Sequence, residues 1–241
     1  MREKILKYKK YLLPVVAAVA VICALLTMMG PMLNFVGTQI NSPNPLASGQ
    51  ALAMLPTLVV MLLFLPSWIT ALVVSRCIKI DTANKKTCVK SICTQLGVCA
   101  GLALFVALCM AGGVRIITGL AFSFGNIFLF AALAIFAFQV IALSALNWFG
   151  MKGVVIPILF LVLGMPIIQV GYDFLPWFWK YMIYPWIPQK FMVEGVREIF
   201  SGASFFNWQT FGLLIIALVG LAALFSILIK ITVKKNNPKQ G

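Results

Sequence analysis

The chain has 241 residues, of which 62% are hydrophobic and 10% are charged, with a net charge of +14 at pH 7 and no histidine. A soluble domain of this length does not need so much apolar surface, so the composition excludes a water-soluble globular protein and indicates a lipid bilayer as the solvent. The basic excess is first a signal of membrane topology and second an attraction for anionic membrane lipid; we expect no nucleic-acid partner.

Long stretches without charged residues divide the chain, and they cover residues 11–75, 91–114, 116–151, 153–172 and 199–229. Because a membrane-spanning helix needs about 20 apolar residues, the first stretch holds two spans and each of the others holds one. The pattern predicts an all-α, polytopic membrane protein with a single transmembrane domain over residues 1–241. The six predicted helices cover about residues 11–30, 52–75, 93–113, 118–146, 153–171 and 209–230.

Six spans place both termini on the same side of the membrane. On that side would lie fifteen of the 19 lysines and arginines; the other side would hold Arg115, Lys180, Lys190 and Arg197. Positively charged loops stay in the cytoplasm, so both termini are predicted to be cytoplasmic, whereas five spans would lose this bias. The run Leu12–Met29 looks like a secretory signal, but it is long and lacks a clear cleavage site, which favours a retained first helix. The expected location is a bacterial cell membrane.

Two loops differ in composition. Residues 30–50, on the predicted outer side, are uncharged and rich in turn formers, so a short ordered turn is expected there. The cytoplasmic loop Ser75–Ser91 is basic, and Thr82 could cap a short helix through Ala83–Lys90. It is either a solvated turn that sets the topology or a surface for a cytoplasmic partner, with these contact residues: Lys79, Asp81, Lys85 and Lys86.

The predicted spans are almost free of charge. Ion-coupled carriers usually keep ionisable side chains inside the bundle, so this class is disfavoured. The embedded polar residues, which include Thr57, Ser67, Thr70, Gln139, Ser144, Asn147 and Gln169, are more typical of hydrogen bonds between helices. Proline kinks are expected at Pro56, Pro66, Pro157 and Pro166, and the G-x-x-x-G pair Gly97 and Gly101 indicates a close approach of two helices.

No catalytic constellation is present in the sequence. The absence of histidine excludes Ser-His, Cys-His and H-E-x-x-H arrangements, and the chain has no P-loop. The six cysteines form no C-x-x-C pair and are interpreted as small packing residues. We therefore predict a non-enzyme without cofactor or metal, in which any ATP hydrolysis belongs to a separate chain.

The segment between Tyr172 and Trp208 is too aromatic for a loop in water and too rich in charge and proline for a span. Pro188 can begin a helix and Gly202 can end it. The apolar residues between them follow helical spacing: Met192, Val193, Val196, Ile199 and Phe200. Two arrangements are open, a helical hairpin over residues 175–202 that dips into the outer leaflet and a single amphipathic helix in the interface.

These features together resemble the membrane subunit of ABC-2 type transporters, and within it the membrane region of the YhgE/Pip (phage infection protein) group. The residues that carry the resemblance are Leu175-Pro176-Trp177-Phe178, Pro185, Pro188, Val196-Arg197-Glu198 and Ser201-Gly202 before Trp208, with Asn147–Gly153 between the fourth and fifth spans.

The resemblance implies an export permease that works as a homo- or heterodimer, with a separate ATP-binding subunit docked at residues 78–90 and an amphiphilic substrate such as a lipid-linked molecule, a peptide or a hydrophobic drug. It implies an outer gate lined by Phe178, Trp179 and Trp186, with Glu194 and Arg197 paired to hold its shape. The alternative is a membrane interaction protein without transport, such as an immunity factor, a phage or toxin receptor or a secretion-machine subunit, which uses the same residues as a recognition surface.

Overall fold

The computed structural model describes residues 2–43, 45–81, 84–119, 123–169, 172–185 and 187–229. Every regular element in these ranges is helical, which confirms the all-α prediction. The α-helices are α1 (Arg2–Ile40), α2 (Pro45–Cys77), α3 (Lys85–Thr118), α4 (Phe124–Phe149), α5 (Val155–Gln169), α6 (Gln189–Phe200) and α7 (Trp208–Phe225). Three short helical turns complete them: η1 (Gly150–Val154), η2 (Tyr172–Phe174) and η3 (Trp179–Ile183).

Five helical segments are long and apolar enough to cross a membrane, so the chain is a multi-pass membrane protein by length and composition. They are Leu12–Ile40, Ala53–Cys77, Lys85–Thr118, Phe124–Ile168 and Trp208–Ile229. The fourth holds 45 residues and joins α4, η1 and α5. As one straight helix it would be about 68 Å long, more than twice the apolar thickness of a bilayer.

The chain turns sharply between α4 and α5. A Cβ atom built on Gly153 would lie 2.2 Å from the carbonyl oxygen of Ala145, although these residues are eight positions apart. In a straight helix eight residues span about 12 Å, so the contact requires a sharp bend. The far end of α5 lies beside the first half of α2, where the Thr57 hydroxyl donates to the Ile168 carbonyl at 2.9 Å. The helices α4 and α5 therefore run in opposite directions.

The prediction of a loop from residue 30 is wrong, because α1 continues to Ile40 and α2 begins at Pro45. A proline inside an apolar helix removes one hydrogen bond but need not end the helix, and Pro31 lies inside α1. Beyond it, Leu33 and Val36 are buried, and Gly37 lies so close to the Thr118 backbone that a Cβ atom would come within 2.7 Å. Packing against the end of α3 thus stabilises the extension.

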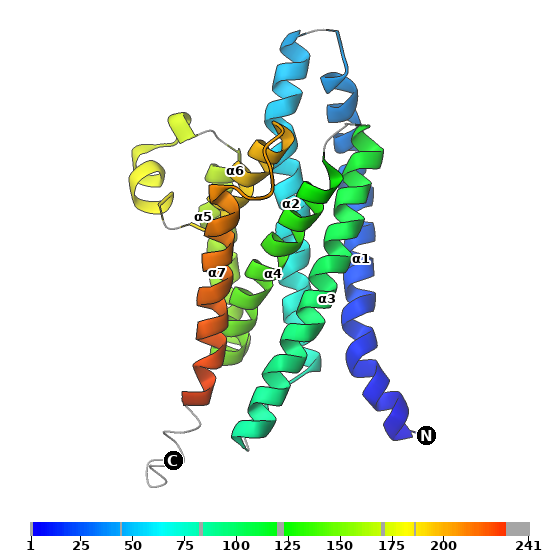
Figure 1. The fold of residues 1–241 in the computed structure, drawn as a ribbon, viewed down its shortest axis with the longest axis vertical. Helices are drawn as coiled ribbons and strands as arrows, with labels where there is room; N and C mark the ends of the chain where they lie inside the picture. Colours follow the sequence, from blue (N-terminus) through cyan, green and yellow to red (C-terminus); the bar gives the residue numbers. More distant parts are fainter. Residues whose placement is uncertain are drawn as a thin grey trace.

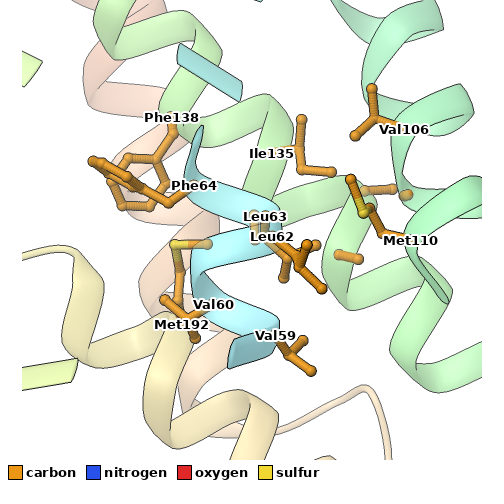
Figure 2. Close-up of a cluster of buried hydrophobic side chains, with 14 of the residues drawn as sticks. Val59, Val60, Leu62, Leu63, Phe64, Val106, Met110, Ile135, Phe138 and Met192 are labelled. Carbon is orange, nitrogen blue, oxygen red and sulfur yellow. The ribbon is translucent and has the colours of Figure 1, made fainter. Parts of the chain in front are cut away.

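The second helix lies at the centre of the bundle and contacts α1, α3, α4, α5 and α6. Figure 2 shows its side chains between those of α3 and α4, with Met192 of α6 approaching from the far side. The rings of Phe64 and Phe138 meet edge to face at 5.1 Å. In the same interface the Gln139 amide donates to the Thr70 hydroxyl at 2.8 Å. Polar residues of the spans do join helices here, as the sequence predicts.

The fourth and seventh helices pack closely over small residues. Gly220 of α7 lies against Val140, and the Ser144 hydroxyl donates to the Gly220 carbonyl at 2.7 Å. The Trp148 indole donates to the Ala223 carbonyl at 2.8 Å. Small residues allow such backbone approaches in membranes. By contrast, Cβ atoms built on Gly97 and Gly101 meet no described atom within 4 Å, so the predicted close contact at this pair is not formed within the described chain.

The two ends of the bundle differ in charge. The start of α1 and the end of α7 lie at one end, together with the connection from α2 to α3 (Figure 1). Arg76 and Lys79 line a cavity there with Met151 of η1, so this end carries the basic connections. The opposite end carries α6 and the segment of residues 172–185, which projects sideways from the bundle. We call this segment the aromatic loop.

Candidate functional site

The α6 helix is the amphipathic element of the candidate site. It begins after Pro188 and is followed by Gly202, whose φ of +97° lies in the left-handed region that favours glycine. Its apolar face, Met192, Val193, Val196 and Ile199, is buried. The helix lies against α2, α4, α5 and α7, so it is inserted into one end of the bundle rather than resting on the outside. This placement differs from a free amphipathic helix in the interface.

Two close contacts hold α6 in place. A Cβ atom built on Gly195 would lie 2.2 Å from the fully buried ring of Phe130. At the start of the helix, the Gln189 amide donates to the Phe160 carbonyl at 2.8 Å, and Gly164 lies against the same side chain. A larger residue at either glycine would push α6 away from α4 or α5.

The aromatic loop is anchored to α5. The Trp179 indole donates to the Leu163 carbonyl at 3.1 Å, and Leu175, Ile187 and Ile167 form a small apolar cluster. The rings of Tyr172 and Tyr184, at the two ends of the loop, lie 4.8 Å apart. The loop is therefore closed on itself and fixed at one side.

The other side of the aromatic loop carries exposed apolar side chains. Trp177 is 70% exposed, and it shares this surface with Phe174, Phe178, Tyr181 and Met182. Such amphipathic rings are typical of the membrane–water interface. Of the predicted gate residues, Phe178 lies on this exposed surface and Trp179 anchors the loop to α5. The centroids of their two rings are 5.2 Å apart. Trp186 lies outside the described residues.

Two carboxylates share one amide donor behind the aromatic loop. Gln209 of α7 donates to Glu194 Oε2 at 2.9 Å and to Glu198 Oε1 at 3.2 Å. Burial raises the pKa of Glu194, the hydrogen bond from Gln209 opposes that rise, nearby Glu198 adds to it, and the charge of Arg197 opposes it. The hydrogen-bond donor to Glu194 is thus Gln209, while Arg197 acts on Glu194 through its charge. Sequence reasoning missed Gln209 because it opens an apolar run, and a polar amide at such a helix start was the only signal.

Arg197 contributes to a small polar cavity of about 10 Å³ between the aromatic loop and α6. The cavity is also lined by Tyr172, Tyr184, Lys190 and Glu194, with room for about one water molecule. The Lys190 ammonium donates to the Pro185 carbonyl at 3.2 Å and lies over the Phe191 ring at 4.8 Å. Burial lowers the pKa of Lys190. Charged groups of both signs meet here at the join between the aromatic loop and α6.

The predicted partner-contact residues are at the opposite end of the bundle. Lys85 and Lys86 are exposed in the first turn of α3, which Asn84 caps together with Thr87. Lys79 lines the basic cavity, and the backbone N–H of Asp81 donates to Ser91 Oγ at 3.4 Å. The predicted helix start at Thr82 and Ala83 lies outside the described residues. In the described ranges no three His, Cys, Asp or Glu side chains gather where a metal ion could bind.

No family model and no curated protein matches this sequence significantly, and no solved structure matches its fold significantly.

The pH dependence of stability tests the environment of Glu194. Because burial raises its pKa, the folded state binds this proton more tightly than the unfolded chain does. The stabilisation from protonated Glu194 is complete below its ordinary pKa of 4.5. It is lost as the pH rises through the raised pKa of the folded state. Glu194→Gln is expected to flatten this fall in the thermal unfolding midpoint in detergent. Asp173→Asn, which removes an exposed carboxylate of the aromatic loop, is the matched control and keeps the slope.

Proposed function

We propose that this protein is the membrane subunit of an ABC-2-like exporter, with six spans and both termini in the cytoplasm. A separate subunit hydrolyses ATP, and two membrane subunits form the pathway. The substrate is amphiphilic: a lipid-linked molecule, a peptide or a hydrophobic drug. The protein resides in the cell membrane of a bacterium.

The topology is supported by the reversal between α4 and α5. Counted as separate crossings, these helices bring the number of spans to six and put the first and last helix ends on one side, as Figure 1 draws them. The basic connections at that end, with Arg76, Lys79 and Lys152, match the preference of positive charge for the cytoplasm. The aromatic loop and α6 then face the outside.

The insertion of α6 into the outer end of the bundle carries the functional proposal. It contacts four bundle helices, so displacement of α6 would open the bundle from outside. The buried polar side chains of the described residues are neutral, among them Ser67, Thr70, Gln139 and Ser144. An interior of this kind offers no ionisable group for ion coupling, which favours energy supplied by a partner subunit.

The chemistry of the outer end supports an amphiphilic substrate. The aromatic loop offers an apolar surface at Phe178 and Trp177, and its ends, Tyr172 and Tyr184, line a cavity with the charged groups Glu194 and Arg197. A molecule with one apolar and one polar part matches both. Trp179 anchors the aromatic loop to α5 through the hydrogen bond from its indole N–H to the Leu163 carbonyl.

Transport and composition of the complex test the proposal together. We expect the full-length protein, purified in mild detergent from its own host, to retain a subunit with a P-loop, and the reconstituted pair to move a fluorescent lipid analogue when ATP is added. Phe178→Ala and Arg197→Ala are expected to lower the rate several-fold, while Phe206→Ala, which removes an exposed ring outside the gate, leaves it unchanged. Retention of a toxin, phage or secretion protein without ATP-dependent transport would instead support the recognition role of the exposed aromatic surface.

Cysteine labelling tests the six spans separately. An impermeant maleimide added to intact cells is expected to label Ser204→Cys and to leave Met151→Cys unlabelled until the membrane is opened, since both side chains are exposed at opposite ends of the bundle. The wild-type protein, with its own six cysteines, gives the background. Equal labelling of both positions in intact cells would contradict the topology.

A further inference from the structure

A polar cavity at the basic end has no role in the function proposed above. It has a volume of about 320 Å³ and lies where the ends of α2, α4 and α7 meet. Its lining residues are Ser75, Arg76, Lys79, Ile80, Leu146, Asn147, Gly150, Met151 and Ile227. Two of them are cations and none is an acid, so the cavity has a net positive charge.

Among the side chains that line the cavity, the two cations are the donors left for a ligand. Both N–H bonds of the Asn147 amide are used, toward the Gln95 side chain at 3.0 Å and the Leu143 carbonyl at 2.8 Å. The Ser75 hydroxyl donates to the Leu72 carbonyl at 2.8 Å. Arg76 lies with one guanidinium nitrogen against the Met151 sulfur, and both Arg76 and Lys79 are exposed to the cavity. Within the described chain neither has a carboxylate partner in an ion pair, so an anion would find both charges available.

The cavity lining also has an apolar part. Leu146, Met151 and Ile227 form it, and Met151 is 55% exposed. The position also corresponds to the membrane surface, because Trp148 and Phe149 at the end of α4 are exposed next to it. Exposed aromatic residues at helix ends mark the depth of the lipid headgroups. A ligand here would meet both cations and hydrocarbon in one lining.

We propose that this cavity binds the phosphate of an anionic phospholipid headgroup, with Arg76 and Lys79 holding the phosphate and the wall of Leu146, Met151 and Ile227 holding the start of the acyl chains. Guanidinium groups bind phosphate oxygens through two parallel N–H bonds, and an ammonium group adds a point charge. Free phosphate could bind the two cations in the same way, but it has no acyl chain to contact the apolar residues. The site depends on the multi-pass membrane fold and not on export.

Lipid binding to the full-length protein in a non-ionic detergent tests the site. Native mass spectrometry with dioctanoyl phosphatidylglycerol, dioctanoyl phosphatidylcholine and inorganic phosphate gives the three affinities. We expect the anionic phosphatidylglycerol to bind more tightly than the zwitterionic phosphatidylcholine. Inorganic phosphate should compete only weakly with phosphatidylglycerol. Arg76→Gln with Lys79→Gln should weaken phosphatidylglycerol by about tenfold or more, since it removes two charge-assisted contacts.

The matched control removes the same charge from the same end of the protein. Lys85→Gln with Lys86→Gln lies outside the cavity lining and should leave the affinity nearly unchanged. If the double variant Arg76→Gln with Lys79→Gln does not fold, single variants repeat the comparison. Lys79→Glu should then weaken lipid binding and Lys85→Glu should not, and both side chains are exposed, so both changes should be tolerated. An equal loss in both pairs overturns the proposal in favour of general surface attraction. Competition by inorganic phosphate at the affinity of the lipid overturns the assignment to a lipid headgroup.

Discussion

Gly153→Ala is expected to destabilise the protein by about 3 kcal/mol or more, at the upper end of what overpacking costs. The new Cβ atom would lie 2.2 Å from the Ala145 carbonyl oxygen and 2.5 Å from its carbonyl carbon. These are backbone atoms of α4, so they cannot turn aside as a flexible side chain would. The only relief is to open the turn between α4 and α5, which would move α5 away from α2 and α6.

The free energy of unfolding in mixed detergent micelles measures this effect. Gly97→Ala is the matched control, because a Cβ atom there meets nothing within 4 Å. Alanine is more favourable than glycine inside a helix by up to about 1 kcal/mol, so this variant should be as stable as the wild type or slightly more stable. Loss of the Thr57–Ile168 hydrogen bond should accompany the destabilisation, and hydrogen exchange at the end of α5 would report it. If both variants unfold alike, the tight reversal at η1 is wrong.

Gly195→Ala is expected to displace α6 and to destabilise the protein by about 1–3 kcal/mol. Its Cβ atom would lie 2.2 Å from the Phe130 ring, which is fully buried and has no free space to enter, and 3.1 Å from Gln209 Cβ. Because Gln209 donates to Glu194, the displacement should also weaken the bond that holds the two carboxylates. The predicted gate would then open without any change to its own side chains.

A double-mutant cycle separates this clash from a general loss of packing. Phe130→Leu should cost stability alone, yet it provides room for the new methyl group, so the double variant should be less destabilised than the sum of the single changes. In the transport assay Gly195→Ala should lower coupling to ATP and raise passive leak. Additive energies in the cycle would show that α6 does not rest on Phe130.

The two glycines illustrate one feature of this fold. Close approaches between helices depend on small residues: Gly37 lies against the end of α3, whereas Gly153, Gly195 and Gly220 all lie against α4. The sequence offers many glycines, and at the recognisable G-x-x-x-G pair, Gly97 and Gly101, a Cβ atom would meet no atom of the described residues within 4 Å. Spacing along one helix cannot report which face meets a partner, because that depends on where the other helices lie.

The sequence by itself determined the helical class of the chain and the positions of its long apolar segments. Apolar runs of sufficient length require backbone hydrogen bonds within the segment, so the spans follow from composition alone. The α6 helix could also be predicted from the sequence, because Pro188 and Gly202 are local signals for its two ends. The extent of α1 was not, since the packing of Leu33 and Val36 against the core outweighs the local turn preference of Gly30 and Pro31.

The tertiary structure alone decided which polar groups meet. Glu194 and Gln209 lie in different helices, and Arg76 and Met151 are 75 residues apart in the chain. The resemblance implied a Glu194–Arg197 pair within one helix, whereas Glu194 accepts a hydrogen bond from Gln209 of α7. Local periodicity specifies the face that a helix buries, whereas the partner across that face depends on how the whole bundle packs.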